Sequence, residues 1–233
     1  MLERETRRIS LPRTVELALS SSIAALFVAS TFFPLTPFIG GPGFITLEIL
    51  LLPVIAALLR PALATVTVFV GSLGMAFGQP SFYQVFGLLG LLVPMVAVAA
   101  GSIAFHYRQG PLIPWTYVLV GAVFYIALSQ NGTLFWLVPY ALVIFSLPLA
   151  LKLKGNSRTA LLCFYTAMSE QVTLNILSIS VLGLVGPVWA VITPFMYSER
   201  ALATIGGAAA VVALKSGLGT RLDLMEPLPV EVK

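Results

Sequence analysis

Residues 47–78 read LEILLLPVIAALLRPALATVTVFVGSLGMAFG and hold a single glutamate and a single arginine. The apolar runs within this stretch, 45–59 and 61–78, are separated by Arg60 and Pro61. Proline suits the first turn of a helix, because that turn has no intrahelical partner for its N–H groups. Apolar segments with so little charge are typical of helices in a lipid bilayer. The stretch therefore predicts two membrane-embedded helices joined by a tight turn.

The shortage of charge extends to the whole chain. Of its 233 residues, 58% are hydrophobic and 9% are charged, and the mean hydropathy is +0.99. A soluble globular domain carries about 25% charged residues, so this chain cannot cover its surface with charge. We therefore expect an all-α integral membrane protein. At roughly 20 apolar residues per span, the length allows up to about eight spans.

Other apolar segments place the remaining helices. We expect them at 14–34, 83–107, 113–129, 133–152, 158–182 and 199–217. A Pro/Gly loop, 34–43, follows the first helix, and a stretch broken by glycine and proline, 183–198, precedes the last one. That stretch is either a re-entrant segment or part of a longer tilted helix. Some of these helices are short, so the expectation is a single domain, 1–233, with a bundle of six to eight transmembrane helices.

The basic residues test this arrangement, because lysine and arginine concentrate in cytoplasmic loops. With eight crossings, nearly all of them fall on one side of the membrane: Arg4, Arg7, Arg8, Arg13, Arg60, Arg108, Lys152, Lys154, Arg158, Lys215 and Arg221. The opposite loops contain no lysine or arginine, and only Arg200 lies near them. We therefore predict a cell-membrane protein whose basic N-terminus (1–13) and polar tail (218–233) are both cytoplasmic.

The start of the chain has an alternative interpretation as a signal peptide. A basic segment precedes the apolar run from Val15 to Phe33, and small residues, Ala29 and Ser30, lie near the end of that run. The run is long for the apolar region of a signal peptide, which favours a membrane helix.

Several function classes find no support in the residues. The chain has no GxxxxGK[ST] phosphate-binding loop, and its only aspartate, histidine and cysteine are Asp223, His106 and Cys163. These three residues are far apart in sequence, so we expect no catalytic triad, no metal site and no cofactor. The net charge of +4 comes from residues at helix ends, which indicates membrane topology rather than nucleic-acid binding.

Polar residues within apolar helices mark the candidate site, because such residues are costly in a bilayer and often functional. Gln171 and Asn175 are four positions apart and share a helix face. We expect a substrate-binding pocket open to the outer half of the membrane. Its candidate residues are Glu48, Gln79, Tyr83, Gln84, Glu170, Gln171, Asn175, Trp189, Glu199 and Arg200. The alternative is a hydrogen-bond network between helices together with an aromatic belt at the membrane interface.

Small residues recur every four positions on the first helix, at Ser21, Ala25 and Ala29. Such a stripe lets two helix backbones approach closely. It is a candidate docking face for another membrane protein, and the alternative is packing inside the bundle.

Three stretches carry a resemblance to a known family. They are SIAALFVAS (22–30) with the Pro/Gly loop after it, residues 47–78, and PFMYSERALATIGGAAAVVAL (194–214). Together they resemble the substrate-binding S components of energy-coupling factor (ECF) vitamin transporters. The likeness rests on the AxxxA arrangement of Ala25 and Ala29, on the paired helices with a glycine-rich end, and on the acidic–basic pair that begins the last helix.

The resemblance implies a subunit that binds a micronutrient from outside the cell and topples in the membrane during transport. The loop at 35–44 would cover the pocket, and Ala25 and Ala29 would face a transmembrane coupling subunit. Separate ATPase subunits would hydrolyse ATP. Two other hypotheses remain: a non-catalytic structural or accessory subunit of a larger membrane complex and, with least support, an intramembrane enzyme that uses Glu170.

Overall fold

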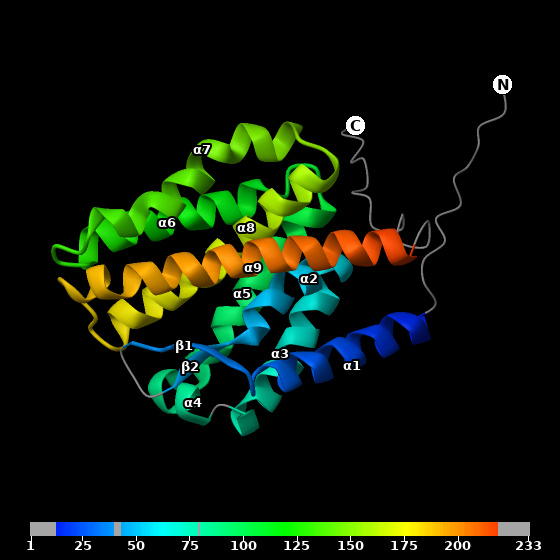
Figure 1. The fold of residues 1–233 in the computed structure, drawn as a ribbon, viewed down its shortest axis with the longest axis horizontal. Coiled ribbons are helices and arrows are strands. Elements are labelled where there is room, and N and C mark those ends of the chain that lie inside the picture. The colour runs from blue at the N-terminus through cyan, green and yellow to red at the C-terminus, as the bar shows by residue number, and fades with distance from the viewer. Residues whose placement is uncertain (1–12, 40–42, 79, 219–233) are drawn as a thin grey trace.

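The structure is a computed structural model that describes residues 13–39, 43–78 and 80–218 and is mainly helical (Figure 1). The α-helices are α1 Arg13–Ser30, α2 Leu51–Leu58, α3 Pro61–Gly78, α4 Pro80–Phe86, α5 Leu92–His106, α6 Leu112–Leu128, α7 Val138–Lys152, α8 Gly155–Ser180 and α9 Val188–Leu218. Short 3₁₀ turns lead into three of them, at η1 Leu47–Leu50, η2 Gly87–Leu91 and η3 Leu134–Leu137. The predicted all-α fold is thus confirmed.

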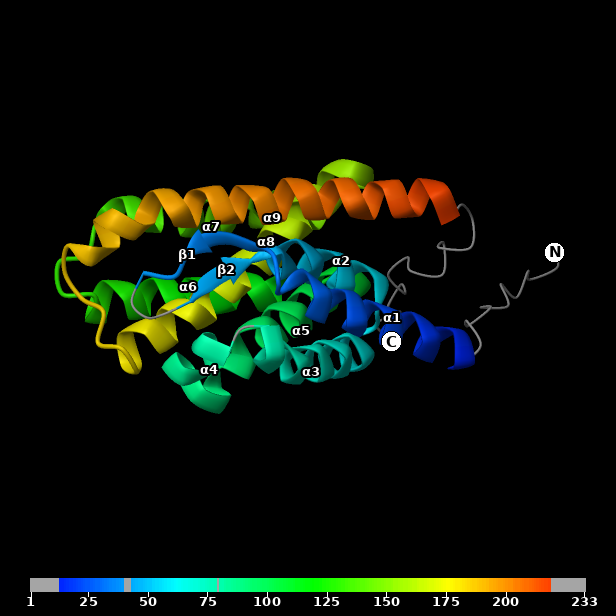
Figure 2. The same cartoon turned by 60° about the horizontal axis from the view of Figure 1, so that its bottom comes forward.

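A small hairpin replaces part of the predicted Pro/Gly loop. Strands β1 (Pro34–Pro37) and β2 (Phe44–Thr46) pair antiparallel. The prolines of β1 provide no N–H for pairing, which restricts proline to edge strands such as this one. The hairpin lies alongside the bundle beside α9, which it contacts through β1 (Figure 2).

Helix α8 is the centre of the bundle and packs against α2, α5, α6, α7 and α9 (Figures 1 and 2). Every residue from 165 to 175 is buried, so this part of the helix is covered on all sides. A helix buried all round is normally apolar all round. The polar residues of α8 are therefore an exception that needs an explanation.

Glycines allow two neighbouring helices to approach α8 closely. A Cβ atom on Gly101 of α5 would lie 2.2 Å from Thr166 Oγ1, and one on Gly121 of α6 would lie 2.5 Å from Val172 Cγ1. Neither contact leaves room for a side chain, so both positions require glycine unless the helices separate.

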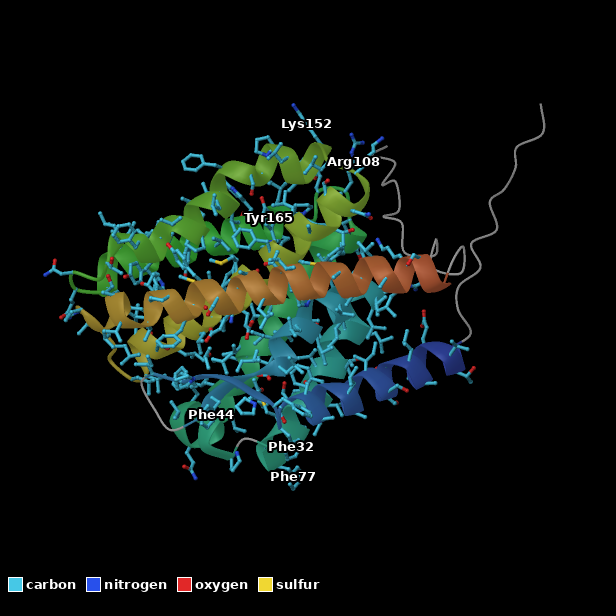
Figure 3. The ribbon with its side chains drawn as sticks, viewed as in Figure 1. Phe32, Phe44, Phe77, Arg108, Lys152 and Tyr165 are labelled. Atoms are coloured by element: carbon cyan, nitrogen blue, oxygen red, sulfur yellow. The ribbon has the colours of Figure 1, made fainter. Side chains whose placement is uncertain are left out.

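Large apolar side chains cover much of the outer surface of α1, α3, α6, α7 and α9. Phe77, at the end of α3, is 85% exposed, and Figure 3 shows it at the lower edge of the molecule with Phe32 and Phe44. Within the described ranges, two helical segments are long and apolar enough to cross a membrane, Gln84–His106 and Leu134–Lys152. Four apolar helices are shorter: Thr14–Ser30, Leu47–Leu58, Pro61–Phe77 and Leu112–Leu128.

The last helix begins earlier than its predicted range, 199–217. We expected a broken segment at 183–198 before a helix at 199–217, but α9 begins at Val188 and continues through Pro194. Proline removes one backbone donor from the helix. The Thr193 hydroxyl donates to the Trp189 carbonyl at 2.6 Å, which adds a bond within the same turn. As a result Glu199 and Arg200 lie well inside a long helix rather than at its start.

Basic residues gather at one end of the bundle. His106, at the end of α5, lies within electrostatic range of Arg60 and Lys215. Figure 3 shows Arg108 and Lys152 at the same end of the molecule. At the other end the loops after α6 and α8 meet, where the Gly186 N–H donates to the Ser129 carbonyl at 2.7 Å. The sequence of these two loops, 129–133 and 181–187, contains no basic residue.

Candidate functional site

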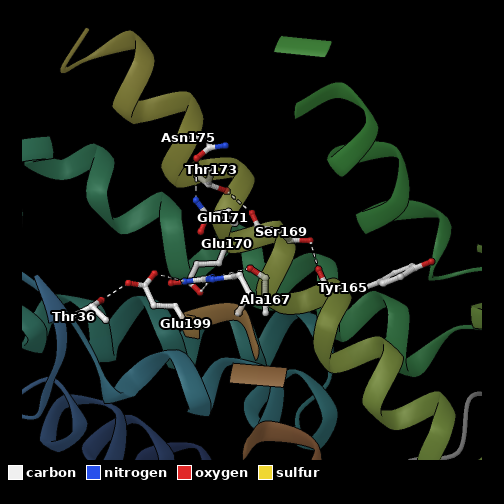
Figure 4. Close-up of polar contacts among 10 residues, drawn as sticks. Thr36, Tyr165, Ala167, Ser169, Glu170, Gln171, Thr173, Asn175 and Glu199 are labelled. Carbon is white, nitrogen blue, oxygen red and sulfur yellow. Dashed lines mark hydrogen bonds and ion pairs between the residues drawn. The ribbon is translucent and has the colours of Figure 1, made fainter. Parts of the chain in front are cut away.

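A buried arginine links the two longest helices. Arg200 of α9 is 2% exposed, and its Nη1 lies 2.6 Å from Glu170 Oε2 of α8 and donates to the Ala167 carbonyl at 2.8 Å. Its Nη2 lies 3.6 Å from Glu199 Oε2. Glu199 also accepts a hydrogen bond from the Thr36 hydroxyl of β1 (Figure 4). One chain of polar contacts therefore connects the hairpin, α9 and α8.

Glu48 adds a third carboxylate to this group. It lies in η1, is buried, and is within electrostatic range of Glu170 and Arg200. Its Oε2 accepts no hydrogen bond from the described residues. Unpaired charge is costly in an apolar interior. Two buried glutamates thus contact one guanidinium, a third lies within electrostatic range of it, and the acidic side chains outnumber the basic one.

A second polar chain runs along the neighbouring face of α8. Gln171 Nε2 donates to Asn175 Oδ1 at 2.9 Å, and Asn175 Nδ2 donates to the Tyr140 hydroxyl of α7. The other amide atom of Gln171, Oε1, is buried and has no hydrogen-bond partner within the described ranges. The amide nitrogen of Gln171 is therefore hydrogen-bonded, whereas its amide oxygen has no partner within the described ranges.

Three aromatic rings pack together near the cavity, and two of them, Trp136 and Trp189, line it with these amides. Trp189 packs edge-to-face on Tyr125 and on Trp136, with ring centroids 5.2 Å and 4.9 Å apart. Trp189 is 1% exposed, and its indole Nε1 donates to no described residue. The Trp136 indole lies beside the Tyr140 hydroxyl but does not meet the geometry of a hydrogen bond. Buried indole N–H groups usually find a partner, so these two are unusual.

A cavity of about 50 Å³ lies between the charged group, which it meets at Glu199, and the amide and indole side chains of Gln171, Asn175, Trp136 and Trp189. One water needs about 10–15 Å³ of such volume, so the space exceeds that of a single solvent molecule. The residues that line it come from β1 and its following loop, β2, η3, α8, the loop after α8, and α9: Pro37, Phe38, Ile39, Ile45, Trp136, Gln171, Leu174, Asn175, Ser178, Leu184, Trp189, Ile192, Phe195, Met196 and Glu199. The cavity is mostly apolar with a few polar groups, which is the usual character of a small-molecule site.

The unsatisfied atoms give the cavity a defined chemistry. A buried polar group without a hydrogen bond costs about 1–3 kcal/mol. Trp189 Nε1 offers a donor and Gln171 Oε1 offers an acceptor, and both residues line the same cavity. A ligand with one matching acceptor and one matching donor would satisfy both groups at once.

The sequence-predicted site residues separate into three groups. Gln171, Asn175, Trp189 and Glu199 line the cavity. Glu48, Glu170 and Arg200 form the charged group behind Glu199 and do not line the cavity. The third group is not at the cavity or cannot be placed there. Gln84 is exposed on α4, whereas Gln79 and the side chain of Tyr83 lie outside the part of the chain that the structure describes.

Sequence reasoning missed Trp136, Tyr140 and Ser178. Ser178 had a usable signal, because it follows Gln171 by seven positions and Asn175 by three and so shares their helix face. Trp136 and Tyr140 had none. They lie in an apolar segment. Trp136 lines the cavity because η3 packs against α7 and α9, and Tyr140 meets Asn175 because α7 packs against α8.

The small-residue stripe of α1 faces outward. Ser21, Ala25 and Ala29 are exposed, while Phe27 and Val28 pack against Gly71 and Gly74 of α3. By contrast, Ala203 and Gly207 of α9 are used inside the bundle, where Gly207 lies against Pro53 of α2. The stripe is thus exposed in the structure.

The described residues contain no group of three or more His, Cys, Asp or Glu side chains arranged to hold a metal ion. The site is therefore described by hydrogen-bonding, aromatic and charged groups. Comparisons of the chain with protein-family models, with curated proteins and with solved structures found no match.

Proposed function

We propose that this chain is the membrane-embedded, substrate-binding subunit of a micronutrient uptake transporter and that separate partner subunits hydrolyse ATP. The observation that carries the proposal is the cavity between the hairpin, α8 and α9. Trp189 and Gln171 line this cavity, and each has a buried polar atom without a hydrogen-bond partner among the described residues. Such atoms are rare unless a ligand or water satisfies them.

The surface of the molecule supports a membrane location. Contiguous exposed apolar surface of more than a few hundred Å² is unusual for a soluble monomer, and large apolar side chains are exposed on five different helices. In a bilayer the same side chains face lipid. The bundle would have six to eight transmembrane helices, with some helices short for a full span.

The distribution of charge supports an orientation. Basic residues gather at the end where α5 ends and α8 begins, and the opposite loops have none. The basic end would be cytoplasmic, and so would both termini. The cavity lies toward the other end, so its ligand would enter from outside the cell.

Cysteine labelling tests this orientation, because Cys163 is the only cysteine and is buried. In a Cys163→Ala background, Leu134→Cys should react with an impermeant maleimide on intact cells. Ser157→Cys should react only after the membrane is opened. Both native residues are exposed in the structure. The opposite labelling pattern, or equal labelling, would overturn the orientation.

Purification from native membranes in mild detergent tests the function. We expect a small molecule to be released on denaturation and ATPase subunits to co-purify. Protein that lacks both would contradict the proposal. Protein without ligand that co-purifies with other membrane proteins would indicate an accessory subunit instead.

Substitutions in the exposed stripe of α1 test whether this face binds the partner subunits. Replacing Ala25 and Ala29 by leucine should abolish co-purification of the coupling and ATPase subunits, because bulky side chains prevent close helix approach. Replacing Ala201 and Ala209, two exposed alanines of α9, by leucine adds the same volume elsewhere. That control should retain the partners. Equal retention by both variants would exclude α1 as the docking face.

A further inference from the structure

The charge of the cavity lining has a single sign. Among the described residues that line it, Glu199 is the only one with an ionisable acid or base, and no Lys, Arg or His lines it. Arg200 is near, but it lies behind Glu199 and does not line the cavity. A ligand would therefore meet a carboxylate and no cation.

The nearest cation is already committed to another partner. Arg200 Nη1 is 2.6 Å from Glu170, whereas the closest approach to Glu199 is 3.6 Å. Glu48 lies within electrostatic range of the same guanidinium. Since these side chains are all more than nine-tenths buried, solvent screens their charges weakly. The excess of carboxylates disfavours an anionic ligand and favours a cationic one.

The unsatisfied atoms refine this chemistry. Gln171 Oε1 is an acceptor without a partner among the described residues, and Glu199 supplies a second acceptor, so the two lining side chains suit an N–H-bearing cation. The indole rings of Trp136 and Trp189 also line the cavity, and tryptophan is the best aromatic partner for a cation. The Trp189 N–H can serve one acceptor on the ligand.

Resting on the proposed function, we infer that the substrate is a small, flat organic cation whose N–H groups bind Glu199 and Gln171 beside the two tryptophans. Amidinium ions and protonated N-heterocycles belong to this class. Ligands that carry a carboxylate or a phosphate are excluded from the cavity by the charge of Glu199.

Three isosteric probes test the sign of the charge. Benzamidinium, benzamide and benzoate have nearly the same size and shape and carry charges of +1, 0 and −1. Binding is measured by equilibrium dialysis with the full chain in detergent, against detergent alone. We expect benzamidinium to bind at least about tenfold more tightly than benzamide and benzoate not to bind measurably. Benzoate binding as tight as benzamidinium, or no binding by any probe, overturns the inference.

The Glu199→Gln variant tests the residue, because glutamine keeps the shape and removes the charge. It should reduce benzamidinium affinity at least about tenfold and leave benzamide affinity within about twofold. Glu16→Gln, a partly exposed glutamate of α1 outside the cavity, is the matched control and should change neither. If Glu199→Gln does not fold, the probe series on the wild-type protein still decides the inference.

The two proposals fail in different ways. A chain that co-purifies with ATPase subunits but prefers benzoate remains a transport subunit with another class of substrate. A chain that prefers benzamidinium but has no ATPase partner has a cation site with a function other than ATP-driven uptake.

Discussion

The two halves of the bundle are packed from different side chains. The core formed mainly by α1, α2, α3 and α5 is filled mostly by aliphatic residues, many of them alanines such as Ala56, Ala64 and Ala97. Besides Phe27 and Phe105, it includes no buried aromatic side chain among the described residues. The core between α6, η3, α7, α8 and the start of α9 contains Tyr125, Trp136, Tyr140, Tyr165 and Trp189. Within the described ranges, only the second of these two cores contributes residues to the cavity lining, such as Trp136 and Trp189.

The difference follows from the shapes and polar atoms of the side chains. Alanine and glycine bring backbones together and introduce no side-chain polar group. Tyrosine and tryptophan are large and rigid and carry a polar atom that needs a partner. Where such rings meet, gaps and unsatisfied atoms arise more easily. We therefore expect mutations in the aliphatic core to change stability and mutations in the aromatic core to change binding as well.

The largest effect should come from Arg200→Met in the aromatic half. Without the guanidinium, Glu48, Glu170 and Glu199 have no buried counter-charge. Loss of one partner of a buried ion pair costs about 3–5 kcal/mol. Chemical unfolding in detergent should show a loss of this size. Arg108→Met, which removes an exposed arginine, should have no measurable effect, and equal behaviour of the two variants would contradict the role of Arg200.

Gly101→Ala tests the aliphatic half and should have the next largest effect. The added methyl group would lie 2.2 Å from Thr166 Oγ1, so α5 and α8 must move apart. Overpacking of this kind costs about 1–3 kcal/mol. Gly217→Ala adds the same methyl group in open space near the end of α9. The melting temperature should fall for Gly101→Ala only, and benzamidinium affinity should change in neither variant.

A pair of tryptophans separates stability from binding. Trp115 Nε1 donates to the Ile144 carbonyl at 2.9 Å, and that carbonyl lacks its helical partner because residue 148 is proline. Trp115→Phe leaves the carbonyl unsatisfied and should cost about 1–3 kcal/mol without changing ligand affinity. Trp189→Phe removes an N–H that has no partner among the described residues, so it should weaken binding more than Trp115→Phe does. Thermal unfolding and dialysis on both variants provide the comparison.

The smallest expected effect is that of Thr36→Val. It removes the hydroxyl that donates to Glu199 and leaves the shape of the hairpin intact. Loss of one such bond costs about 0.5–1.5 kcal/mol. Hydrogen exchange should become faster in 34–39 and 43–46 and remain unchanged in α8. Unchanged exchange in the hairpin would mean that the bond does not hold it.

Much of the helical arrangement was predictable from the sequence, because apolar runs separated by Pro, Gly and basic residues mark helix limits. Most predicted helices match observed helices to within a few residues, as for α3 and α6. The polar face of α8 was also predictable, since Gln171 and Asn175 are one helical turn apart and bond to each other.

Other features depend on tertiary contacts. The hairpin lies in a segment rich in Pro and Gly, which has the composition of a loop, and its register is fixed by pairing such as Leu47 N–H to the Phe33 carbonyl. The predicted start of the last helix, at residue 199, was wrong because Pro194 normally indicates a break. In the structure α9 begins at Val188 and continues through this proline. The contribution of Trp136 to the cavity depends on how η3 packs, which local sequence does not show.

The length of α9 sets a condition on the lipid around it. Its 31 residues rise about 46 Å at 1.5 Å per residue, whereas the hydrocarbon core of a bilayer is about 30 Å thick. In the membrane location proposed above, the helix would tilt strongly or extend beyond the hydrocarbon at one or both ends. Because α9 carries Arg200, Glu199 and Trp189 on one helix, thinner or thicker membranes would then change the depth of the cavity. Acyl-chain length would in that case affect substrate binding, with an optimum that liposomes of graded thickness would reveal.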